Sequence, residues 1–276
     1  MLKILTLNWN GKDKLQTLYP TLMNVIGNID YQWLIKDNGS NDDSILLEKE
    51  WNNNKVHIIN YPHNRDNFAH GCNFLFKEAN PTSEDLVLLL NNDVIFNDTS
   101  SLKNMISIIE NDNSVGVVGA RLLYKNTNKL QHAGVTFTPG YKTPMHFRSG
   151  EISDVNAEKN REFQAVTGAV FLTKAKYYEN ICRTNKSGLP GMDQNLWWSF
   201  DDICSALAIK YQMNKKIVYC GHTNIFHEES ATLKKNPVNK MFLTQNLKYF
   251  FSQWSNKYTI DRDSYINNPN HNIYKL

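Results

Sequence analysis

The 276-residue sequence has few cysteines and no long hydrophobic run. The four cysteines are Cys72, Cys182, Cys204 and Cys220. They form no Cys-x-x-Cys pair and lack zinc-site spacing, so we expect buried free thiols in a reducing, cytoplasmic compartment. No stretch approaches the roughly 18 consecutive apolar residues that a membrane helix needs, and the first residues contain no signal-peptide core. We therefore expect neither a membrane-spanning nor a secreted protein.

The sequence also lacks a strong charge of either sign. It contains 30 Lys and Arg residues against 27 Asp and Glu residues, which leaves a formal net charge of +3. This balance argues against a dedicated nucleic-acid-binding protein, whose basic residues gather on one face. With 41% hydrophobic residues, 13 glycines and 8 prolines, the chain is neither disordered nor collagen-like. Its length suffices for one large domain that buries about 75% of the surface exposed in the unfolded chain.

Two familiar nucleotide-binding motifs are missing. An apolar run at residues 2–7 predicts a first buried strand, and Asn8-Trp9-Asn10-Gly11 follows it as a turn. No Gly-x-Gly-x-x-Gly follows this strand, and no Gly-Lys-Ser/Thr occurs anywhere in the chain. The sequence therefore excludes a Rossmann dinucleotide site and a P-loop.

Hydrophobic patterning predicts strands that alternate with helices. Strands are expected at 2–7, 31–36, 56–60, 86–90, 115–119 and 217–220, and helices at 15–26, 44–51, 67–79, 101–110, 203–211 and within 234–258. Residues 163–173 form an apolar segment with a break, and Pro20 weakens the first helix. The alternation favours an α/β protein with a mainly parallel central sheet flanked by helices. We expect one domain at 1–230, with a C-terminal helix and tail at 231–276 packed on it, on a membrane or on a partner.

Polar residues directly after apolar strands mark the expected site, because ligands of open parallel sheets bind at the carboxyl ends of the strands. The places are Asn8-Trp9-Asn10, Asp37-Asn38, Asn91-Asn92-Asp93 and His227, which is expected in a short loop after the last strand. Asp93 ends a buried strand, where a charge is costly unless solvated or paired with a cation. It would suit a divalent ion with oxygen ligands, or belong to a turn that caps the strand.

Asp201-Asp202 and His227 each allow two interpretations. The two acids precede a predicted helix, where they would either cap its N-terminus or supply a general base. A single histidine is usually an ordinary surface or core residue, whereas a histidine beside Asp93 would be a metal ligand.

Taken together and in order, these residues resemble an inverting glycosyltransferase of family 2 with the GT-A fold, and most closely its rhamnosyltransferase-like branch, which builds surface polysaccharides. The resemblance covers about residues 2 to 230. The motifs that carry it are Leu7-Asn8-Trp9-Asn10-Gly11, Asp37-Asn38-Gly39-Ser40, Phe68-Ala69-His70-Gly71-Cys72-Asn73, Leu89-Leu90-Asn91-Asn92-Asp93, Gln131-His132-Ala133-Gly134, Gln164-Ala165-Val166-Thr167-Gly168-Ala169, Phe200-Asp201-Asp202 and His227 with Glu229-Ser230.

The resemblance implies a role for each matched residue. The residues implied in binding the nucleotide sugar are Leu7, Asn8, Trp9, Asp37, Phe68, His70, Asn73, Asn91, Asn92, Asp93, Thr167, Gly168 and Ala169. Among them, Asp37 would hydrogen-bond the base edge, and Thr167-Gly168-Ala169 would floor the pocket under the transferred sugar. Asp93 and His227 would hold Mn²⁺ or Mg²⁺ at the diphosphate. Asp202, with Asp201 beside it, would be the general base that deprotonates the acceptor hydroxyl.

The sequence departs from the family pattern at several positions. His70 stands in place of an arginine, Asp201 in place of a glutamate, and Cys204 in place of an aspartate. The His70 change would weaken donor affinity or make it pH-dependent. Trp197-Trp198 before the acid pair is unusual and would either stack on an acceptor sugar or simply pack.

The resemblance implies a metal-dependent transfer of a sugar from a UDP- or dTDP-sugar to a hydroxyl of a glycan or lipid-linked glycan. The C-terminal lysines, Lys234, Lys235, Lys240 and Lys248, would rest on an anionic inner membrane face, or the stretch would pack as a helix or a homodimer contact. Two other functions compete. One is an inactive GT-A domain that binds glycans as a scaffold. The other is a sugar nucleotidyltransferase, although the turn after the first strand fits that class poorly.

Overall fold

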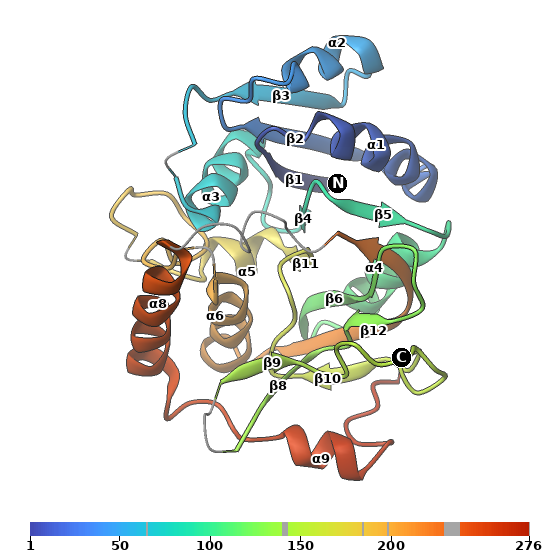
Figure 1. Cartoon of the computed structure of the whole chain (residues 1–276), viewed down its shortest axis with the longest axis vertical. Coiled ribbons are helices and arrows are strands. Elements are labelled where there is room, and N and C mark those ends of the chain that lie inside the picture. Colours follow the sequence, from blue (N-terminus) through green and yellow to red (C-terminus); the bar gives the residue numbers. More distant parts are fainter. Residues whose placement is uncertain (65, 140–142, 184, 198, 229–237, 276) are drawn as a thin grey trace.

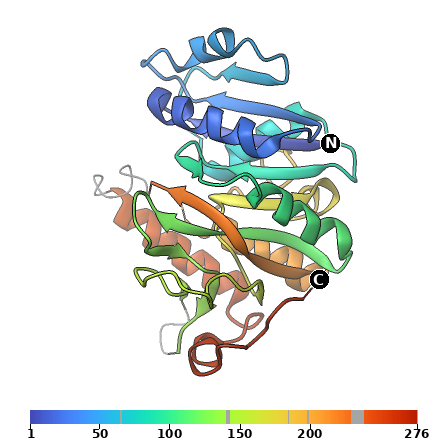
Figure 2. The same ribbon diagram turned by 90° about the vertical axis from the view of Figure 1, so that its right-hand side faces the viewer.

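The computed structural model describes residues 1–64, 66–139, 143–183, 185–197, 199–228 and 238–275, with backbone only for 238–241. Its centre is a mixed sheet with helices on both faces (Figures 1 and 2). Along the sheet the strands run in the order β10-β12-β6-β11-β4-β1-β2-β3. Two buried hydrophobic clusters fill the spaces between the sheet and its helices.

The N-terminal half supplies the parallel part of the sheet. Its strands are β1 (Leu2–Asn8), β2 (Tyr31–Asp37), β3 (Val56–Asn60) and β4 (Leu86–Leu90). The helices between them are α1 (Lys12–Ile26), a short 3₁₀ turn (Ser44–Leu46) continued by α2 (Leu47–Trp51), and α3 (Phe68–Ala79). Pro20 lies on the exposed side of α1, so the buried side of the helix continues through it.

The C-terminal half makes the sheet mixed. Its elements are β5 (Val94–Phe96), α4 (Ser101–Asn111), β6 (Val115–Tyr124), β7 (Leu130–His132), β8 (Val135–Phe137), β9 (Pro144–His146), β10 (Arg161–Phe163), β11 (Val170–Lys174), α5 (Ala175–Glu179), α6 (Asp201–Leu207), a π turn (Ala208–Gln212), β12 (Lys216–His227), α8 (Val238–Trp254) and α9 (Arg262–Asn267). Strand β11 is antiparallel to β4 and β6, while β12 is parallel to β6. The expected α/β fold with a central sheet flanked by helices is confirmed, but the sheet is mixed, whereas a mainly parallel one was expected.

Several element boundaries differ from the expectations. The apolar segment 163–173 contains only the last residue of β10, Phe163, and most of β11, and residues 164–169 connect the two strands. The strand predicted at 217–220 is present, but its predicted end is wrong. Strand β12 runs on to His227 past an irregularity between Cys220 and Ile225, since its partner β6 is also longer than expected. His227 therefore ends a strand and does not lie in a loop.

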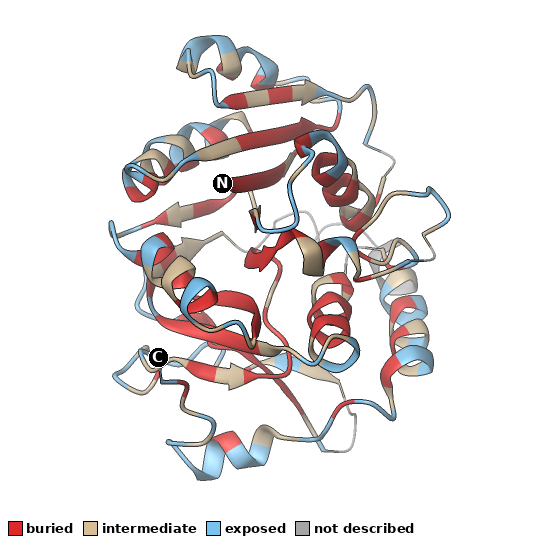
Figure 3. Ribbon diagram, turned by 180° about the vertical axis from the view of Figure 1, so that it is seen from behind, coloured by how far each residue is buried: buried red, intermediate tan, exposed pale blue. Residues whose placement is uncertain are grey.

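The C-terminal elements α8 and α9 pack onto the rest of the chain. Phe250, Trp254 and Tyr265 belong to the same buried cluster as residues of α3 and α6, and Figure 3 shows buried positions along α8. Cys72, Cys204 and Cys220 are buried, as expected, whereas Cys182 is half-buried. Within the described ranges, no helix combines the length and the apolar character needed to cross a membrane.

Candidate active site

The carboxyl ends of three neighbouring strands bring Asn8, Asp37 and Asn92 together. Asn8 ends β1, Asp37 ends β2, and Asn92 follows β4, so the parallel register places all three at one sheet edge. The Asn8 amide donates to Asp37 Oδ2 at 2.8 Å, and the Asn92 amide donates to Asn8 Oδ1 at 2.8 Å. The structure thus assembles these predicted residues into one hydrogen-bonded row.

Asp37 is almost completely buried, with 2% of its surface exposed. Its Oδ1 accepts the backbone N–H of Ser40, and its Oδ2 accepts the Ser40 hydroxyl and the Asn8 amide. A carboxylate offers about four lone-pair positions, so Asp37 retains capacity for a donor on a ligand. Its contacts show that it also joins the loops after β1 and β2. The base contact implied for Asp37 stays a prediction.

Strand pairing brings Asp93 against His227. Strand β5 pairs antiparallel with β12, and in this register Val94 lies opposite His227. The preceding residue, Asp93, accepts the N–H of Glu228 through its backbone carbonyl at 3.1 Å. Asp93 Oδ1 then lies 3.1 Å from His227 Nε2, and both side chains are largely buried, at 5% and 12% exposure.

The Asp93–His227 pair fits a divalent metal. Within the described ranges no group of three or more His, Cys, Asp or Glu residues gathers around one point. A pair is nevertheless sufficient for Mg²⁺ or a similar ion beside a diphosphate, because such ions commonly take one or two protein ligands and complete their shell with phosphate oxygens and water. Lys14 Nζ lies 3.6 Å from Asp93 Oδ2 and adds positive charge where a diphosphate would lie.

The two acids at the start of α6 lie in different environments. Asp201 is buried, its Oδ1 accepts the N–H of Asp202, and its Oδ2 has no hydrogen-bond partner. Burial, and then the adjacent charge of Asp202, raise the pKa of Asp201 to about 7. Asp202 is half-exposed, and its Oδ2 accepts the N–H of Gly168 at 2.7 Å. Of the two residues, Asp202 is therefore the more accessible to solvent.

A path of hydrogen bonds and side-chain contacts connects Asp202 to the Asp93–His227 pair. Gly168 holds Asp202, and the carbonyl of the next residue, Ala169, accepts the N–H of Asn91 at 3.0 Å. The Asn91 amide then lies 3.3 Å from His227 Nε2. The predicted floor at 167–169 therefore lies between the expected base and the expected metal ligands.

His132 supports this floor from below. It is fully buried, and its Nε2 accepts the N–H of Thr167 at 3.4 Å. Burial, followed by the charges of His146 and His227, holds the pKa of His132 well below its usual range. The ring therefore stays neutral and keeps a lone pair for Thr167.

His70, on α3, belongs to a partly buried polar cluster with Asp66 and Lys36. Its Nδ1 lies 3.1 Å from Asp66 Oδ2, and Lys36 Nζ lies 3.3 Å from the same oxygen. The Lys36 side chain is fully buried, with its ammonium 3.7 Å from the centre of the Tyr61 ring. Burial lowers the pKa of Lys36, while the charge of Asp66 opposes this effect.

Asn73 is the clear correction among the predicted binding residues. It is fully buried on α3, and its Oδ1 accepts the N–H of Met192 and the hydroxyl of Tyr178. Its amide donates to the Met192 carbonyl. The side chain therefore holds the loop around 192 in place, and the structure does not bring it to the sheet edge.

The other predicted residues differ in exposure and surroundings. Trp9 is 47% exposed directly after β1, whereas Leu7 and Phe68 are half-buried and pack against the hydrophobic cluster under α3. Trp197 stacks on Phe242 of α8 with ring centres 5.4 Å apart, so one face of its ring is already covered. Trp198, Glu229 and Ser230 lie outside the described residues.

Sequence reasoning missed Lys14, Lys36 and Ser40. The Ser40 contacts follow from the recognised Asp37-Asn38-Gly39-Ser40 turn. The available signal for Lys36 was a lysine directly after the apolar residues Trp33, Leu34 and Ile35 of the same strand. Lys14 carried no such signal, because it lies just before the helix predicted at 15–26, whereas α1 begins at Lys12.

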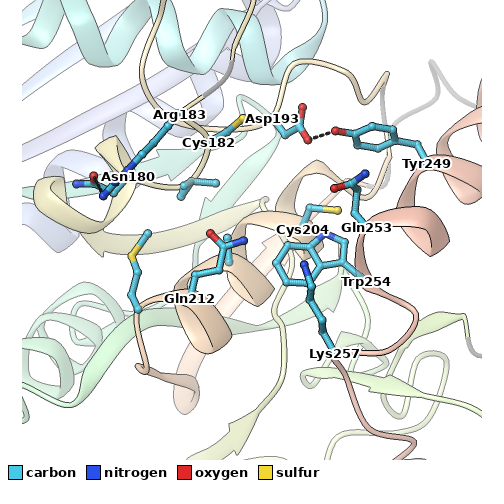
Figure 4. Close-up of a pocket in the computed structure, with 13 residues that line it drawn as sticks. Asn180, Cys182, Arg183, Asp193, Cys204, Gln212, Tyr249, Gln253, Trp254 and Lys257 are labelled. Carbon is cyan, nitrogen blue, oxygen red and sulfur yellow. Dashed lines mark hydrogen bonds between the residues drawn. The ribbon is translucent and has the colours of Figure 1, made fainter.

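A separate cavity of about 480 Å³ lies between α5, α6 and α8 (Figure 4). Its lining residues are Asn180, Ile181, Cys182, Arg183, Asp193, Cys204, Ala208, Gln212, Met213, Tyr249, Gln253, Trp254 and Lys257. None of them is a predicted site residue. Tyr249 donates its hydroxyl to Asp193 at 2.6 Å across this cavity.

Known proteins resemble the chain in sequence and in fold. No family model matches. The O-antigen biosynthesis protein RfbC of Myxococcus xanthus is 26% identical over 210 residues, which is 74% of this chain and 15% of that protein. The O-antigen chain rhamnosyltransferase RfbN of Salmonella typhimurium is 22% identical over 219 residues, 79% of this chain and 60% of that protein. The chain thus spans less than two thirds of the length of either relative.

Among solved structures, the mannosyltransferase PcManGT of Pyrobaculum calidifontis, in complex with GDP-Man and Mn²⁺, superposes with a TM-score of 0.61. The match covers 94% of this chain and 65% of that chain at 12% identity, so it shows the fold alone. The resemblance expected from the motifs is confirmed by these comparisons. The chain has the GT-A fold of nucleotide-sugar glycosyltransferases and is similar in sequence to O-antigen rhamnosyltransferases.

Proposed function

We propose that the chain is a metal-dependent, inverting glycosyltransferase of family 2 that acts in surface polysaccharide biosynthesis. The observation that carries the proposal is the continuous contact path from Asp202 through Gly168-Ala169 and Asn91 to the Asp93–His227 pair. A half-exposed carboxylate and a cation site on either side of one small floor suit a displacement at a sugar bound between them.

In the proposed reaction, Asp202 accepts the proton of the acceptor hydroxyl as its oxygen bonds to the anomeric carbon. The bond from that carbon to the donor diphosphate breaks, and the nucleoside diphosphate leaves from the opposite face with its electron pair. Asp93 and His227 would hold the divalent ion. When bound, the ion would neutralise charge on the leaving diphosphate. The hydrogen bond from Gly168 would keep Asp202 oriented during proton transfer.

The donor would be a UDP- or dTDP-linked hexose or 6-deoxyhexose. Support comes from the sequence similarity to a rhamnosyltransferase and from the row of Asn8, Asp37 and Asn92 at the sheet edge, where a base and ribose would lie. A dTDP-linked rhamnose is therefore the first donor to test.

The acceptor would be a glycan or a lipid-linked glycan. Trp197, with one ring face on Phe242, retains a second face on which an acceptor sugar could stack. For a lipid-linked acceptor, the chain would work in the cytoplasm and touch the inner membrane face through the lysines at the start of the C-terminal segment. Of those lysines, Lys248 has a described side chain, and it is exposed. A homodimer through α8 is the competing use of this surface.

Thermal stabilisation by nucleotides tests the proposal directly. The unfolding temperature would be measured with UDP, dTDP, GDP and CMP, each with and without Mn²⁺, because a ligand of the native state raises stability by mass action. A rise with UDP or dTDP that requires Mn²⁺ supports the proposal and narrows the donor screen to one nucleotide. No rise with any nucleotide contradicts it and favours the glycan-binding scaffold. Formation of a nucleotide sugar from a sugar phosphate would instead indicate a nucleotidyltransferase.

A further inference from the structure

The side chain of Gln131, on β7, contacts His227 at two points. Its Oε1 lies 2.6 Å from His227 Nδ1, and its Nε2 donates to the His227 carbonyl at 3.4 Å. Gln131 is 4% exposed, and its own carbonyl lies 3.1 Å from His146 Nδ1, so its backbone is held as well. None of the roles implied by the sequence uses this residue.

The two contacts together determine which ring nitrogen of His227 carries the proton. A backbone carbonyl only accepts hydrogen bonds, so the amide nitrogen of Gln131 must face it, and Oε1 must face the ring. Because Oε1 is also only an acceptor, Nδ1 of His227 carries a hydrogen and donates it.

In the neutral ring, the other nitrogen, Nε2, then has the lone pair. Nε2 lies 3.1 Å from Asp93 Oδ1 and 3.3 Å from the Asn91 amide. The amide can donate to the lone pair, but a carboxylate oxygen at that distance repels it unless a cation or a proton lies between them. The arrangement is the one in which a neutral imidazole binds a metal through Nε2 while a neighbouring acceptor holds the opposite N–H.

We propose that Gln131 is a positioning residue that holds His227 as the Nδ1–H tautomer, with Nε2 aimed at a divalent cation shared with Asp93. This inference rests on the proposed metal-dependent function and adds a residue to it. Gln131 does not touch the cation. It acts by fixing the proton and the ring orientation of His227.

Two substitutions separate the hydrogen bond from mere packing. Gln131→Met keeps the length of the side chain but removes the acceptor, and we expect it to lower Mn²⁺ affinity in the presence of UDP or dTDP by about 10- to 100-fold. Gln131→Glu keeps an acceptor for Nδ1–H and should retain most of the affinity, although it loses the contact with the His227 carbonyl. Electron paramagnetic resonance of free Mn²⁺ measures both affinities without sugar transfer.

Gln164→Met is the matched control. Gln164 is a similarly buried glutamine, but its amide donates to the Thr259 carbonyl and to Asp261, away from the metal pair. Its loss should lower stability and leave Mn²⁺ affinity unchanged.

The tautomer itself is measured by ¹H–¹⁵N NMR of the His227 ring, assigned with a His227→Gln variant. We expect Nδ1 to carry a hydrogen in the metal-free wild type, whether or not Nε2 shares a second proton with Asp93, and Nδ1 to lose this constant protonation in Gln131→Met. A wild-type ring with its single hydrogen on Nε2, or equal Mn²⁺ affinity of the wild type and Gln131→Met, would overturn this inference alone. A wild type that binds no Mn²⁺ with any nucleotide would overturn the metal dependence of the proposed function, and this inference with it.

Discussion

At the scale of single residues, Asp201 and Asp202 show how adjacent carboxylates acquire different properties. Asp201 turns into the protein, where burial disfavours its charge. Asp202 turns toward the floor at Gly168 and stays half-exposed. Phe200, directly before them, has a φ of 68°, a left-handed conformation that is costly for an aromatic residue. Strain of this kind concentrates at functional sites, which agrees with the role proposed for Asp202.

Asp202→Asn should abolish transfer and preserve nucleotide binding. The asparagine oxygen can still accept from Gly168, but it cannot take up the acceptor proton, so we expect a rate loss of about 10²- to 10⁴-fold. Nucleotide affinity in the presence of Mn²⁺, measured by calorimetry, should change less than twofold. Loss of nucleotide binding in this variant would contradict the assignment of Asp202 as the base.

Asp201→Asn should flatten the pH dependence of stability. In the wild type, Asp201 ionises near pH 4 when unfolded but only near pH 7 when folded, so the folded state binds more protons between these values. The free energy of unfolding therefore falls as pH rises through this range, by up to a few kcal/mol. Asparagine cannot ionise, so urea unfolding of the variant should lose this part of the slope.

Asp154→Asn is the control for that measurement. Hydrogen bonds from Arg148 help to hold the pKa of Asp154 at about 2, below its unfolded value, so its contribution is lost only in more acidic solution. Between pH 5 and 8 this variant should keep the wild-type slope. Equal slopes for the wild type and Asp201→Asn would contradict the buried position of the Asp201 carboxyl.

At the scale of elements, the turn from β1 to α1 lies where the nucleotide is proposed to bind. Gly11 precedes α1 with a φ of −127°, which any residue can adopt. A Cβ at this position would nevertheless lie 2.5 Å from both Asn8 Oδ1 and Asn92 Nδ2. Glycine is favoured here by the close approach of two side chains and not by backbone conformation.

Gly11→Ala should therefore weaken nucleotide binding. The added methyl group must push apart Asn8 and Asn92, and the loss of one hydrogen bond of about 1 kcal/mol predicts a several-fold fall in affinity for UDP or dTDP. Calorimetry measures the nucleotide affinity of the variant. Gly188→Ala is the control, because a Cβ there meets no atom within 4 Å, although its φ of +70° makes the substitution destabilising. If Gly11→Ala and Gly188→Ala bind the nucleotide with equal affinity, the Asn8–Asn92 contact is dispensable for nucleotide binding.

At the scale of the whole molecule, α8 closes the core beneath the acid pair. Phe250 is fully buried and stacks on Phe200 and Tyr258, with ring centres 5.4 and 5.6 Å away. Phe200 in turn precedes Asp201 and Asp202. The described part of the C-terminal segment therefore supports the site from behind, and the division of the chain near residue 230 stays a prediction.

Phe250→Ala should destabilise the protein by about 3–5 kcal/mol, because it removes a large buried ring from a packed cluster. The change should also slow transfer at temperatures where the variant is folded, because Phe200 loses its stacking partner. Chemical unfolding measures the first effect. Leu243→Ala on the same helix, at a position 46% exposed, should change stability by less than about 0.5 kcal/mol. An unaltered unfolding midpoint in Phe250→Ala would mean that α8 packs differently.

The sequence alone determined the strands at 56–60 and 86–90, the turn at Asp37-Asn38-Gly39-Ser40 and the residues that end β1, β2 and β4. These features depend on local patterns, namely uninterrupted apolar runs and turn-forming residues that follow them. Local order along the chain was enough to place Asn8, Asp37 and Asn92 at one edge, because parallel strands end together.

Only the tertiary structure decided the pairing of Asp93 with His227 and the burial of the Asp201, Asn73 and Lys36 side chains. Each depends on contacts between segments far apart in the chain. The antiparallel pairing of β5 with β12, which brings Asp93 to His227, is one example. A pattern of neighbouring residues cannot encode such a register. It is set when distant strands bury their apolar faces together, and the polar side chains at their ends meet as a consequence.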